Sequence, residues 1–283
     1  MNQYVSPIIS VEELLALKQT TTIVLIDASA GPDSYEKYKH HHLAGALYVD
    51  LNNDLADIKE DASQGGRHPL PSVTEFATTL TKLGICPDSH VIIYDDKNSS
   101  NAAARFWWML KSIGHEKVQV LNGGYQAALK ASFETNSKTE APLTTEVYPS
   151  TDWKLPMADM NEVDAVRLNK AYLIIDVRDK IRYDGIKEPI DLVAGHIPGA
   201  TNIPFSTNLD ADGFYLAADV LKEKYRVAIN NKDTNHVIVH CGSGVTACHT
   251  LLAMAYAGLE IPKLYVGSWS EWSRNEKPIG TSL

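Results

Sequence analysis

Four short motifs occur twice in this chain, in the same order, and this internal repeat constrains the fold more than any other feature. A repeat that covers most of the chain implies two similar domains, each with its own core. The length of 283 residues suffices for two domains of ordinary size. The matched pairs are residues 23–27 (IVLID) and 173–177 (LIIDV), 42–46 (HLAGA) and 196–200 (HIPGA), 90–95 (HVIIYD) and 236–241 (HVIVHC), and 121–125 (LNGGY) and 265–269 (YVGSW).

A change in composition marks the boundary between the two halves. Residues from about 132 to 153 are rich in Thr, Ser, Glu and Pro and show no apolar period, which is typical of a linker. We therefore expect one domain over residues 1–140 and a second over residues 150–283.

Each half alternates short apolar runs with helical segments. The runs are continuous and rich in Val and Ile, as in strands that are buried on both faces of a parallel sheet. Capping patterns that begin at Ser10, Ser72 and Asp159 indicate helix starts. Asp27 and Asp176 each end a predicted strand, where we expect them to position the following loop. The pattern predicts an α/β fold with a central, mostly parallel sheet flanked by helices in each domain. The clearest runs are residues 23–26, 91–93, 173–175 and 237–239.

Charge and composition limit the classes of partner. The formal net charge is -9 and no Lys/Arg run forms a basic stripe, so we expect no nucleic-acid partner. The longest apolar stretch, residues 251–257, is too short to span a bilayer, and the first residues lack the features of a signal peptide. Three cysteines, an odd and low number, fit a reducing compartment. These observations predict a cytoplasmic protein that has no membrane contact.

The strongest chemical signal is the segment that contains Cys241. A buried strand ends at this residue, and a loop with Gly242 and Gly244 follows before a helix predicted from about Thr246 to Ala257. Glycines allow backbone N–H groups to converge into an anion-binding nest, and a helix N-terminus adds partial positive charge. Both features favour a thiolate, and both would stabilise a persulfide anion on Cys241.

The sequence gives less support for a reactive role of the other two cysteines, for phosphatase chemistry and for a metal site. Cys86 and Cys248 lack a comparable setting, so we interpret them as structural. A phosphatase would need an Arg six residues after the nucleophile, where this chain has Ala247. The three histidines at 40–42 are adjacent, and no Cys/His pattern follows them, so we expect no metal site; His42 is interpreted as a structural residue.

The loop at residues 241–247 (CGSGVTA) resembles the active loop of the 3-mercaptopyruvate sulfurtransferases, within the tandem-domain rhodanese family. Thiosulfate-preferring members of that family have basic residues where this chain has Gly242 and Ser243. The resemblance implies two tandem rhodanese-like domains, of which only the second is catalytic and the first supplies one wall of a cleft. The repeat agrees, because it places Asp95 where the second half has Cys241. Further shared motifs are residues 105–109 (RFWWM), 176–178 (DVR), 195–200 (GHIPGA) and 267–272 (GSWSEW).

The resemblance also implies the site residues. Cys241, Ser243 and His68 would be catalytic, and Asn52 stands where the family has an Asp that orients the histidine. Arg182 falls on the arginine that binds the donor's carboxylate or sulfonate. A second substrate arginine is common in mercaptopyruvate enzymes, and Lys187 lies in that region here. The remaining expected substrate-binding residues are Gly242, Gly244, Val245 and Thr246.

The activity implied is sulfur transfer through a Cys241 persulfide, without a metal or organic cofactor. The donor would be a small anion, either 3-mercaptopyruvate or thiosulfate, and the acceptor a thiol, thioredoxin or cyanide. A different class remains open, namely a non-catalytic sulfur-carrier or redox module that binds a partner protein. We expect the chain to act as a monomer.

Overall fold

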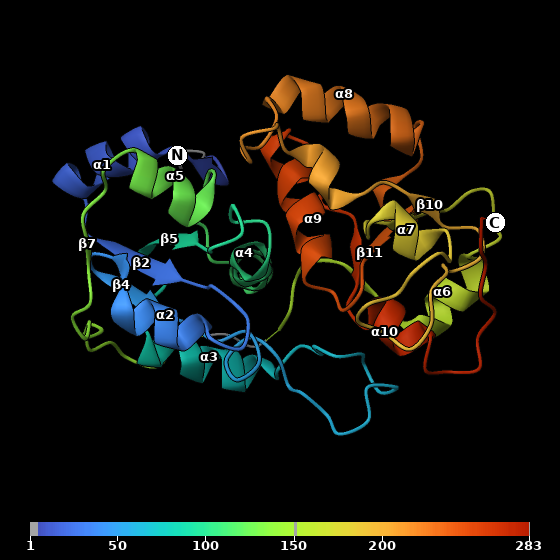
Figure 1. The fold of residues 1–283 in the computed structure, drawn as a ribbon, viewed down its shortest axis with the longest axis horizontal. Helices are drawn as coiled ribbons and strands as arrows, with labels where there is room; N and C mark the ends of the chain where they lie inside the picture. The colour runs from blue at the N-terminus through green and yellow to red at the C-terminus, as the bar shows by residue number, and fades with distance from the viewer. Residues whose placement is uncertain (1–4, 150–151, 283) are drawn as a thin grey trace. The chain divides into compact units, whose positions relative to one another are not determined.

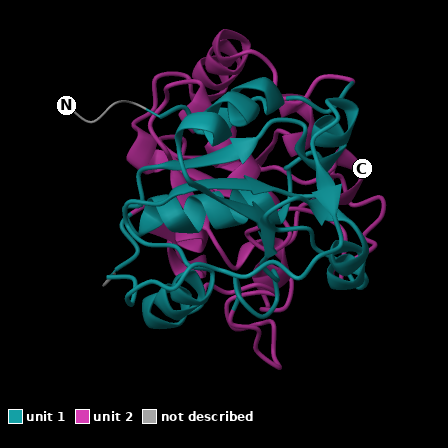
Figure 2. Cartoon of the chain, turned by 90° about the vertical axis from the view of Figure 1, so that its left-hand side faces the viewer, with its two compact units in different colours: residues 1–56, 71–154, 212–214 teal, residues 57–70, 155–211, 215–283 magenta. Residues whose placement is uncertain are grey.

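A computed structural model describes residues 5–149 and 152–282. The chain divides into two compact units (Figure 2). Unit 1 comprises residues 1–56, 71–154 and 212–214, and unit 2 comprises residues 57–70, 155–211 and 215–283. The division therefore differs from a single cut near residue 140–150, because two short segments are grouped with the other half of the chain. Segment 57–70 belongs to unit 2, where hydrogen bonds attach it to residues 270–275.

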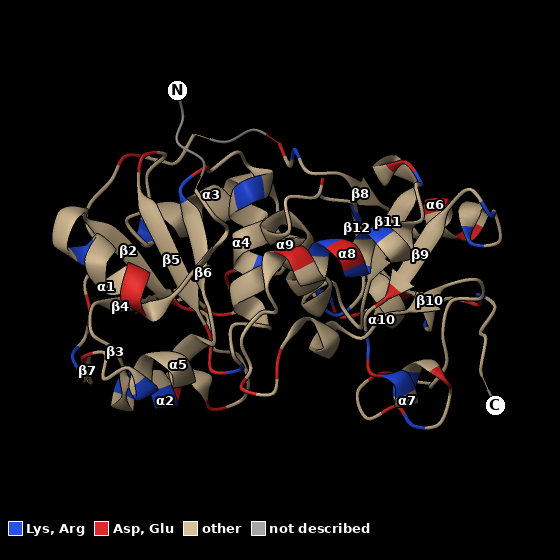
Figure 3. Cartoon of the chain, turned by 90° about the horizontal axis from the view of Figure 1, so that it is seen from above, with Lys and Arg blue, Asp and Glu red and all other residues tan. Residues whose placement is uncertain are grey.

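The core of unit 1 is a sheet of five parallel strands in the order β4–β2–β5–β6–β1. Figure 3 shows β5 and β6 without charged residues, as expected for strands covered on both faces. A short antiparallel pair, β3–β7, lies outside this sheet. The strands are β1 (Ile8–Ile9), β2 (Ile23–Asp27), β3 (His42–Leu43), β4 (Ala46–Tyr48), β5 (His90–Tyr94), β6 (Val118–Leu121) and β7 (Thr135–Asn136).

Helices cover both faces of this first sheet. Helices α1 and α5 share one apolar core with the strands, to which Leu14, Leu25, Ile92 and Ala128 contribute. Helices α2 and α3 lie on the opposite side of the sheet (Figure 1), and α4 packs against β5 and β6. The helices are α1 (Val11–Thr20), α2 (Ser34–His40), α3 (Val73–Lys82), α4 (Ala102–Ser112) and α5 (Gly124–Lys130).

Unit 2 is built in the same way. Its five parallel strands have the order β10–β9–β11–β12–β8, and α6 and α10 share one apolar core with them. Helix α9 packs against β11, and α8 packs against α9. The elements are β8 (Met157–Ala158), α6 (Met160–Val166), β9 (Leu173–Asp176), α7 (Lys180–Tyr183), β10 (Thr201–Asn202), the 3-10 helices Phe205–Asn208 and Thr234–His236, α8 (Ala218–Ile229), β11 (Val237–His240), α9 (Thr246–Tyr256), β12 (Lys263–Tyr265) and α10 (Ser268–Trp272).

The two five-stranded sheets have identical strand orders when the strands of each sheet are counted along the chain. In both, the order is third, second, fourth, fifth, first. Strand β5 corresponds to β11, so the predicted equivalence of Asp95 and Cys241 holds: each residue directly follows the central strand of its sheet. The tandem repeat, the parallel sheets and the α/β class expected from the sequence are confirmed.

Polar side chains at element ends behave as the sequence predicts. Ser10 and Ser72 form complete capping boxes with Glu13 and Glu75. At the strand ends, the Oδ1 atoms of Asp27 and Asp176 accept hydrogen bonds from the backbone N–H groups two residues later, at 2.8 and 3.0 Å. Each aspartate therefore fixes the first turn of the loop that leaves the sheet.

Substitution Ser72→Ala should lower the free energy of unfolding by about 1 kcal/mol, because the backbone N–H of Glu75 in the first turn of α3 loses its capping partner, Ser72 Oγ. Urea-induced unfolding measures the change. Thr74→Ala, on an exposed position in the same helix turn, is the matched control and should change stability by less than about 0.5 kcal/mol. Equal losses in the two variants would contradict a stabilising cap.

Candidate active site

Cys241 lies at the carboxyl end of β11, the central strand of unit 2, with its side chain almost fully buried. Three hydrogen bonds attach it and the next residue to the first turn of α10. The Cys241 N–H donates to Ser268 Oγ at 3.2 Å, and the carbonyl of Cys241 accepts from the Trp269 N–H at 3.0 Å. The Gly242 carbonyl accepts from the Ser270 N–H at 2.8 Å. Helix α10 thus holds the loop backbone in one position.

Gly244 has a backbone conformation and surroundings that only glycine suits. Gly244 has a φ of 73°, and a Cβ there would lie 2.5 Å from the carbonyl oxygen of Val266, so no other residue fits without a shift. Val245 is buried at the N-cap of α9, and Thr246 begins that helix. The chain therefore passes from Cys241 into a helix N-terminus within four residues, as the sequence predicts.

Cys248 makes a contact that supports the Cys241 loop. It is fully buried in the first turns of α9, and its Sγ donates to the Gly244 carbonyl at 3.3 Å. This contact braces the loop from the helix side. Cys86 is half-buried in unit 1, where its Sγ lies 3.3 Å from Ser89 Oγ.

Ser243 and His68 are brought together by the fold. Ser243 Oγ and His68 Nδ1 form a hydrogen bond of 2.8 Å, across 175 positions of the sequence. Segment 57–70 carries His68 and is fastened to α10: the Gly65 N–H donates to Glu271 Oε1 at 2.9 Å, and the Arg67 N–H donates to Ser270 Oγ at 3.0 Å. Helix α10 thus positions both the cysteine loop and the histidine segment.

Asn52 belongs to unit 1, where its backbone N–H donates to Asp50 Oδ1 at 2.8 Å. Its predicted role of orienting His68 stays a prediction. Lys187, in unit 2, has an exposed side chain that makes no hydrogen bond or ion pair with the described residues.

Arg182 lies in α7, whose basic residues appear in Figure 3. Its Nε donates to both carboxylate oxygens of Glu188, at 2.9 and 3.0 Å, and its Nη2 donates to Asp191 Oδ2 at 3.2 Å. Burial opposes ionisation of Glu188, but the hydrogen bond from Arg182 and two backbone N–H groups outweigh it and lower its pKa. The guanidinium is therefore held in one orientation by two carboxylates.

Sequence reasoning did not identify the carboxylate at the centre of this region, Asp191. Its side chain is fully buried and is bonded by three arginines: Arg67 Nε at 2.9 Å, Arg182 Nη2 at 3.2 Å and Arg274 Nη1 at 3.1 Å. The one local signal was Arg67, which directly precedes His68 in the sequence.

Arg178, two residues after the end of β9, extends this network through Glu188, to which its Nη1 donates at 3.3 Å. Arg178 bonds Asp176 at 2.6 Å and the Gly195 carbonyl at 2.6 Å, and its guanidinium lies over the ring of Trp269. Burial would raise the pKa of Asp176, but the charge of Arg178 prevails and lowers it. Burial also lowers the pKa of His240, which favours a neutral imidazole beside Cys241.

The geometry of unit 2 is thus that of a buried thiol on a glycine loop, with a Ser–His pair and oriented guanidinium groups on the same unit. The comparisons with known proteins agree with this description. Two stretches of the chain, residues 10–131 and 159–275, match the family described as "Rhodanese-like domain". The chain belongs to the rhodanese family.

Relatives within the rhodanese family have two kinds of name. A Pseudomonas aeruginosa protein named probable 3-mercaptopyruvate sulfurtransferase is 37% identical over 247 residues, which are 86% of each chain. The chicken thiosulfate sulfurtransferase is 31% identical, over 90% of this chain and 87% of the relative. Among solved structures, SseA from Escherichia coli, described with the 3-mercaptopyruvate sulfotransferases, matches with a TM-score of 0.77 at 29% identity, covering 94% of this chain and all of that one.

The matching rhodanese domain in unit 1 holds an aspartate where unit 2 holds the cysteine. Asp95 is fully buried and accepts hydrogen bonds from the backbone N–H groups of Lys97, Asn101 and Ala103, at 2.8, 3.0 and 3.1 Å. Burial raises its pKa to about 6, against the effect of those N–H groups. A carboxyl group of the chain itself therefore fills the nest in unit 1.

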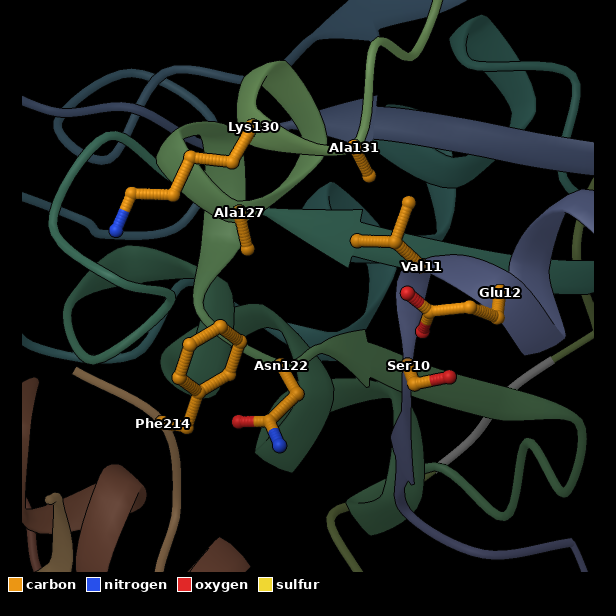
Figure 4. Close-up of a pocket in the computed structure, with 8 residues that line it drawn as sticks. All are labelled: Ser10, Val11, Glu12, Asn122, Ala127, Lys130, Ala131 and Phe214. Atoms are coloured by element: carbon orange, nitrogen blue, oxygen red, sulfur yellow. The ribbon is translucent and has the colours of Figure 1, made fainter. Parts of the chain in front are cut away.

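Unit 1 also contains a pocket of about 270 Å³ beside the start of α1 and the helix α5 (Figure 4). Glu12 and Lys130 are the charged side chains of its described lining, and neither a thiol nor an imidazole is among them. This pocket therefore offers no nucleophile comparable with Cys241. Its lining consists of Ser10, Val11, Glu12, Asn122, Ala127, Lys130, Ala131 and Phe214.

Within residues 5–149 and 152–282, no three His, Cys, Asp or Glu side chains cluster as a metal site would require. His42 is structural, as expected: it is fully buried, with Nδ1 at 2.6 Å from the Tyr38 carbonyl oxygen. None of the described helices is long and apolar enough to cross a membrane.

Substitution Gly244→Ala should slow alkylation of Cys241 by iodoacetamide about a hundredfold, because the new methyl group would displace the loop from Val266. Peptide mass spectrometry after timed alkylation measures the rate. Gly258→Ala is the matched control, since Gly258 has a φ of 70° but open space around its Cβ position. Both variants should lose about 1–2 kcal/mol of stability from backbone strain, and only the first should lose reactivity. Similar reactivity in both would contradict a steric requirement at Gly244.

Proposed function

We propose that the protein is a sulfurtransferase that moves sulfane sulfur from 3-mercaptopyruvate to a thiol acceptor through a persulfide on Cys241. The observation that carries the proposal is the 2.8 Å hydrogen bond between Ser243 and His68. Ser243 follows the buried Cys241 by two positions in the glycine loop. The names of the relatives from Pseudomonas aeruginosa and Escherichia coli support the same activity.

In the first half-reaction, the Cys241 thiolate attacks the sulfur of 3-mercaptopyruvate. The new S–S bond forms as the bond between sulfur and C3 breaks, and the electron pair of that bond leaves with pyruvate as its enolate. The pair of Ser243 and His68 supplies the proton that converts the enolate into pyruvate. The carboxylate of the donor binds Arg182, whose planar guanidinium suits a planar anion.

The persulfide is stabilised by the same loop that orients the thiol. Backbone N–H groups of the glycine loop and the N-terminus of α9 favour negative charge on the outer sulfur. In the second half-reaction, an acceptor thiolate attacks the outer sulfur and releases the Cys241 thiolate. Thioredoxin, a low-molecular-weight thiol or cyanide would serve as acceptor. This chemistry requires reduced Cys241, which a cytoplasmic location would maintain.

Thiosulfate is the second candidate donor, with sulfite as the leaving group. The chicken relative that is named for this substrate favours it. The neutral residues Gly242 and Ser243 favour mercaptopyruvate, because they add no cation for the second charge of thiosulfate. A non-catalytic carrier would also form the persulfide but would not turn over repeatedly with small donors.

Treatment with 3-mercaptopyruvate should add the mass of one sulfur atom to the peptide that contains Cys241, because this thiol accepts the sulfur. Mass spectrometry of the intact protein and its peptides makes the measurement. Cys241→Ser should abolish the adduct, whereas the control Cys248→Ser should retain it. The absence of an adduct with both mercaptopyruvate and thiosulfate would refute the proposed function.

Substitutions Ser243→Ala and His68→Gln should each lower kcat with 3-mercaptopyruvate about a hundredfold, because the enolate loses its proton source. Turnover with thiosulfate should change little, since sulfite leaves without needing a proton. Pyruvate and thiocyanate formation report the two reactions. Equal losses with both donors would indicate that Ser243 and His68 act on the cysteine or on the fold instead.

A further inference from the structure

Two guanidinium groups converge on the residue that follows the nucleophile. A Cβ built on Gly242 would lie 3.0 Å from Nη2 of Arg67, 3.4 Å from Nη2 of Arg182 and 3.6 Å from Oδ2 of Asp191, the carboxylate that both arginines bind. The absence of a side chain at Gly242 therefore leaves room for both groups beside Cys241. They come from distant parts of the chain, segment 57–70 and helix α7, and both belong to unit 2.

Asp191 holds these two guanidinium groups side by side. Arg67 donates from Nε to Asp191 Oδ1 at 2.9 Å, and its Nη2 lies 3.5 Å from Oδ2. Arg182 donates from Nη2 to the same Oδ2 at 3.2 Å. The backbone of Arg67 is fixed as well, through its N–H to Ser270 Oγ. Hydrogen bonds therefore fix both the backbone and the guanidinium group of Arg67.

The ion-pair network around the loop has an excess of positive charge. It connects four guanidinium groups to three carboxylates, so that every arginine has a carboxylate partner and these seven side chains together carry a net charge of +1. Partial burial makes such a charge more effective at binding an anion than it would be in bulk water. The members are Arg67, Arg178, Arg182 and Arg274 with Asp176, Glu188 and Asp191.

We infer that Arg67 is a substrate-binding residue, which together with Arg182 binds the carboxylate of the sulfur donor beside Cys241. The inference deepens the proposed function and rests on it, because it assigns the anionic end of the donor to a two-arginine clamp. Two planar guanidinium groups on one carboxylate orient it more strictly than one does. Arg67 supplies the second guanidinium for which the sequence around Lys187 has no arginine. The site therefore selects small 2-oxo acids over neutral sulfur compounds.

Arg274 provides a contrast within the same network. Its Nη1 also bonds Asp191 Oδ1, at 3.1 Å, and donates to the Ser270 carbonyl at 2.8 Å. It is not among the groups nearest to the Gly242 position. Arg274 therefore supports Asp191, whereas Arg67 and Arg182 reach the loop.

The test compares alkylation of Cys241 by 3-bromopyruvate and by bromoacetone, which differ in the carboxylate alone. In both reactions the thiolate forms a bond to the CH₂ carbon and bromide leaves, so no sulfur transfer is involved. The rate ratio of the two reagents at Cys241, divided by the ratio at Cys86 in the same sample, measures recognition of the carboxylate. Peptide mass spectrometry gives both rates.

Arg67→Ala should lower this normalised ratio at least about tenfold, the loss expected for one hydrogen bond to a charged group. Arg67→Lys should restore part of it, because an ammonium keeps the charge without the fork. Arg274→Ala, the matched control, should change the ratio much less. With 3-mercaptopyruvate, Arg67→Ala should raise KM by a similar factor and leave kcat nearly unchanged.

An unchanged ratio in Arg67→Ala would overturn the inference, as would equal slowing with both reagents, which would indicate a structural role. The alkylation readout is independent of persulfide formation. If the wild-type protein forms no persulfide yet shows the Arg67-dependent ratio, the proposed function fails and the anion site stands. If the persulfide forms but the ratio does not depend on Arg67, the proposed function stands and the role of Arg67 in binding the anion is refuted.

Discussion

The anchoring of the Cys241 loop to helix α10 is the interaction on which the rest of the candidate site depends. The sheet brings Cys241 to the carboxyl end of a buried central strand, where a loop would otherwise be free to move. Backbone hydrogen bonds from residues 241 and 242 to α10 remove that freedom. The same helix turn accepts hydrogen bonds from the N–H groups of Gly65 and Arg67, so one short element positions both the Cys241 loop and the segment that contains Arg67 and His68.

The duplicated fold provides an internal comparison of two loops at matching positions. Both follow the central strand of a five-stranded parallel sheet with the same strand order. In unit 1 the loop's N–H groups bind the carboxyl group of Asp95, a permanent occupant that has no sulfur chemistry. In unit 2 the corresponding residue is Cys241, the residue that we propose carries the persulfide. Under that proposal, one difference at the same place in the fold separates a nest filled by the chain itself from a reactive one.

Charge in unit 2 is arranged around buried carboxylates and not around exposed lysines. Asp191 and Glu188 form ion pairs that hold arginine side chains in fixed orientations. Burial of either carboxylate without such a partner would be strongly unfavourable. Each carboxylate that orients an arginine also neutralises one positive charge. The network contains four arginines and three carboxylates, and the resulting net charge of +1 is consistent with the anion site that we propose.

Local sequence determined the helices, the strands and the glycine loop of Cys241, whereas the tertiary structure decided which side chains surround that cysteine. The apolar runs, the capping boxes and the glycine loop of Cys241 are readable because each depends on residues within a few positions of one another. The resemblance to a known family placed Ser243, His68 and Arg182 in the site, and the structure adds the hydrogen bond between the first two. Arg67 and Asp191 lie 124 positions apart, and no local pattern predicts their pairing or the grouping of segment 57–70 with unit 2. Only folding brings such distant charges together, because their attraction is realised where burial removes the competing water.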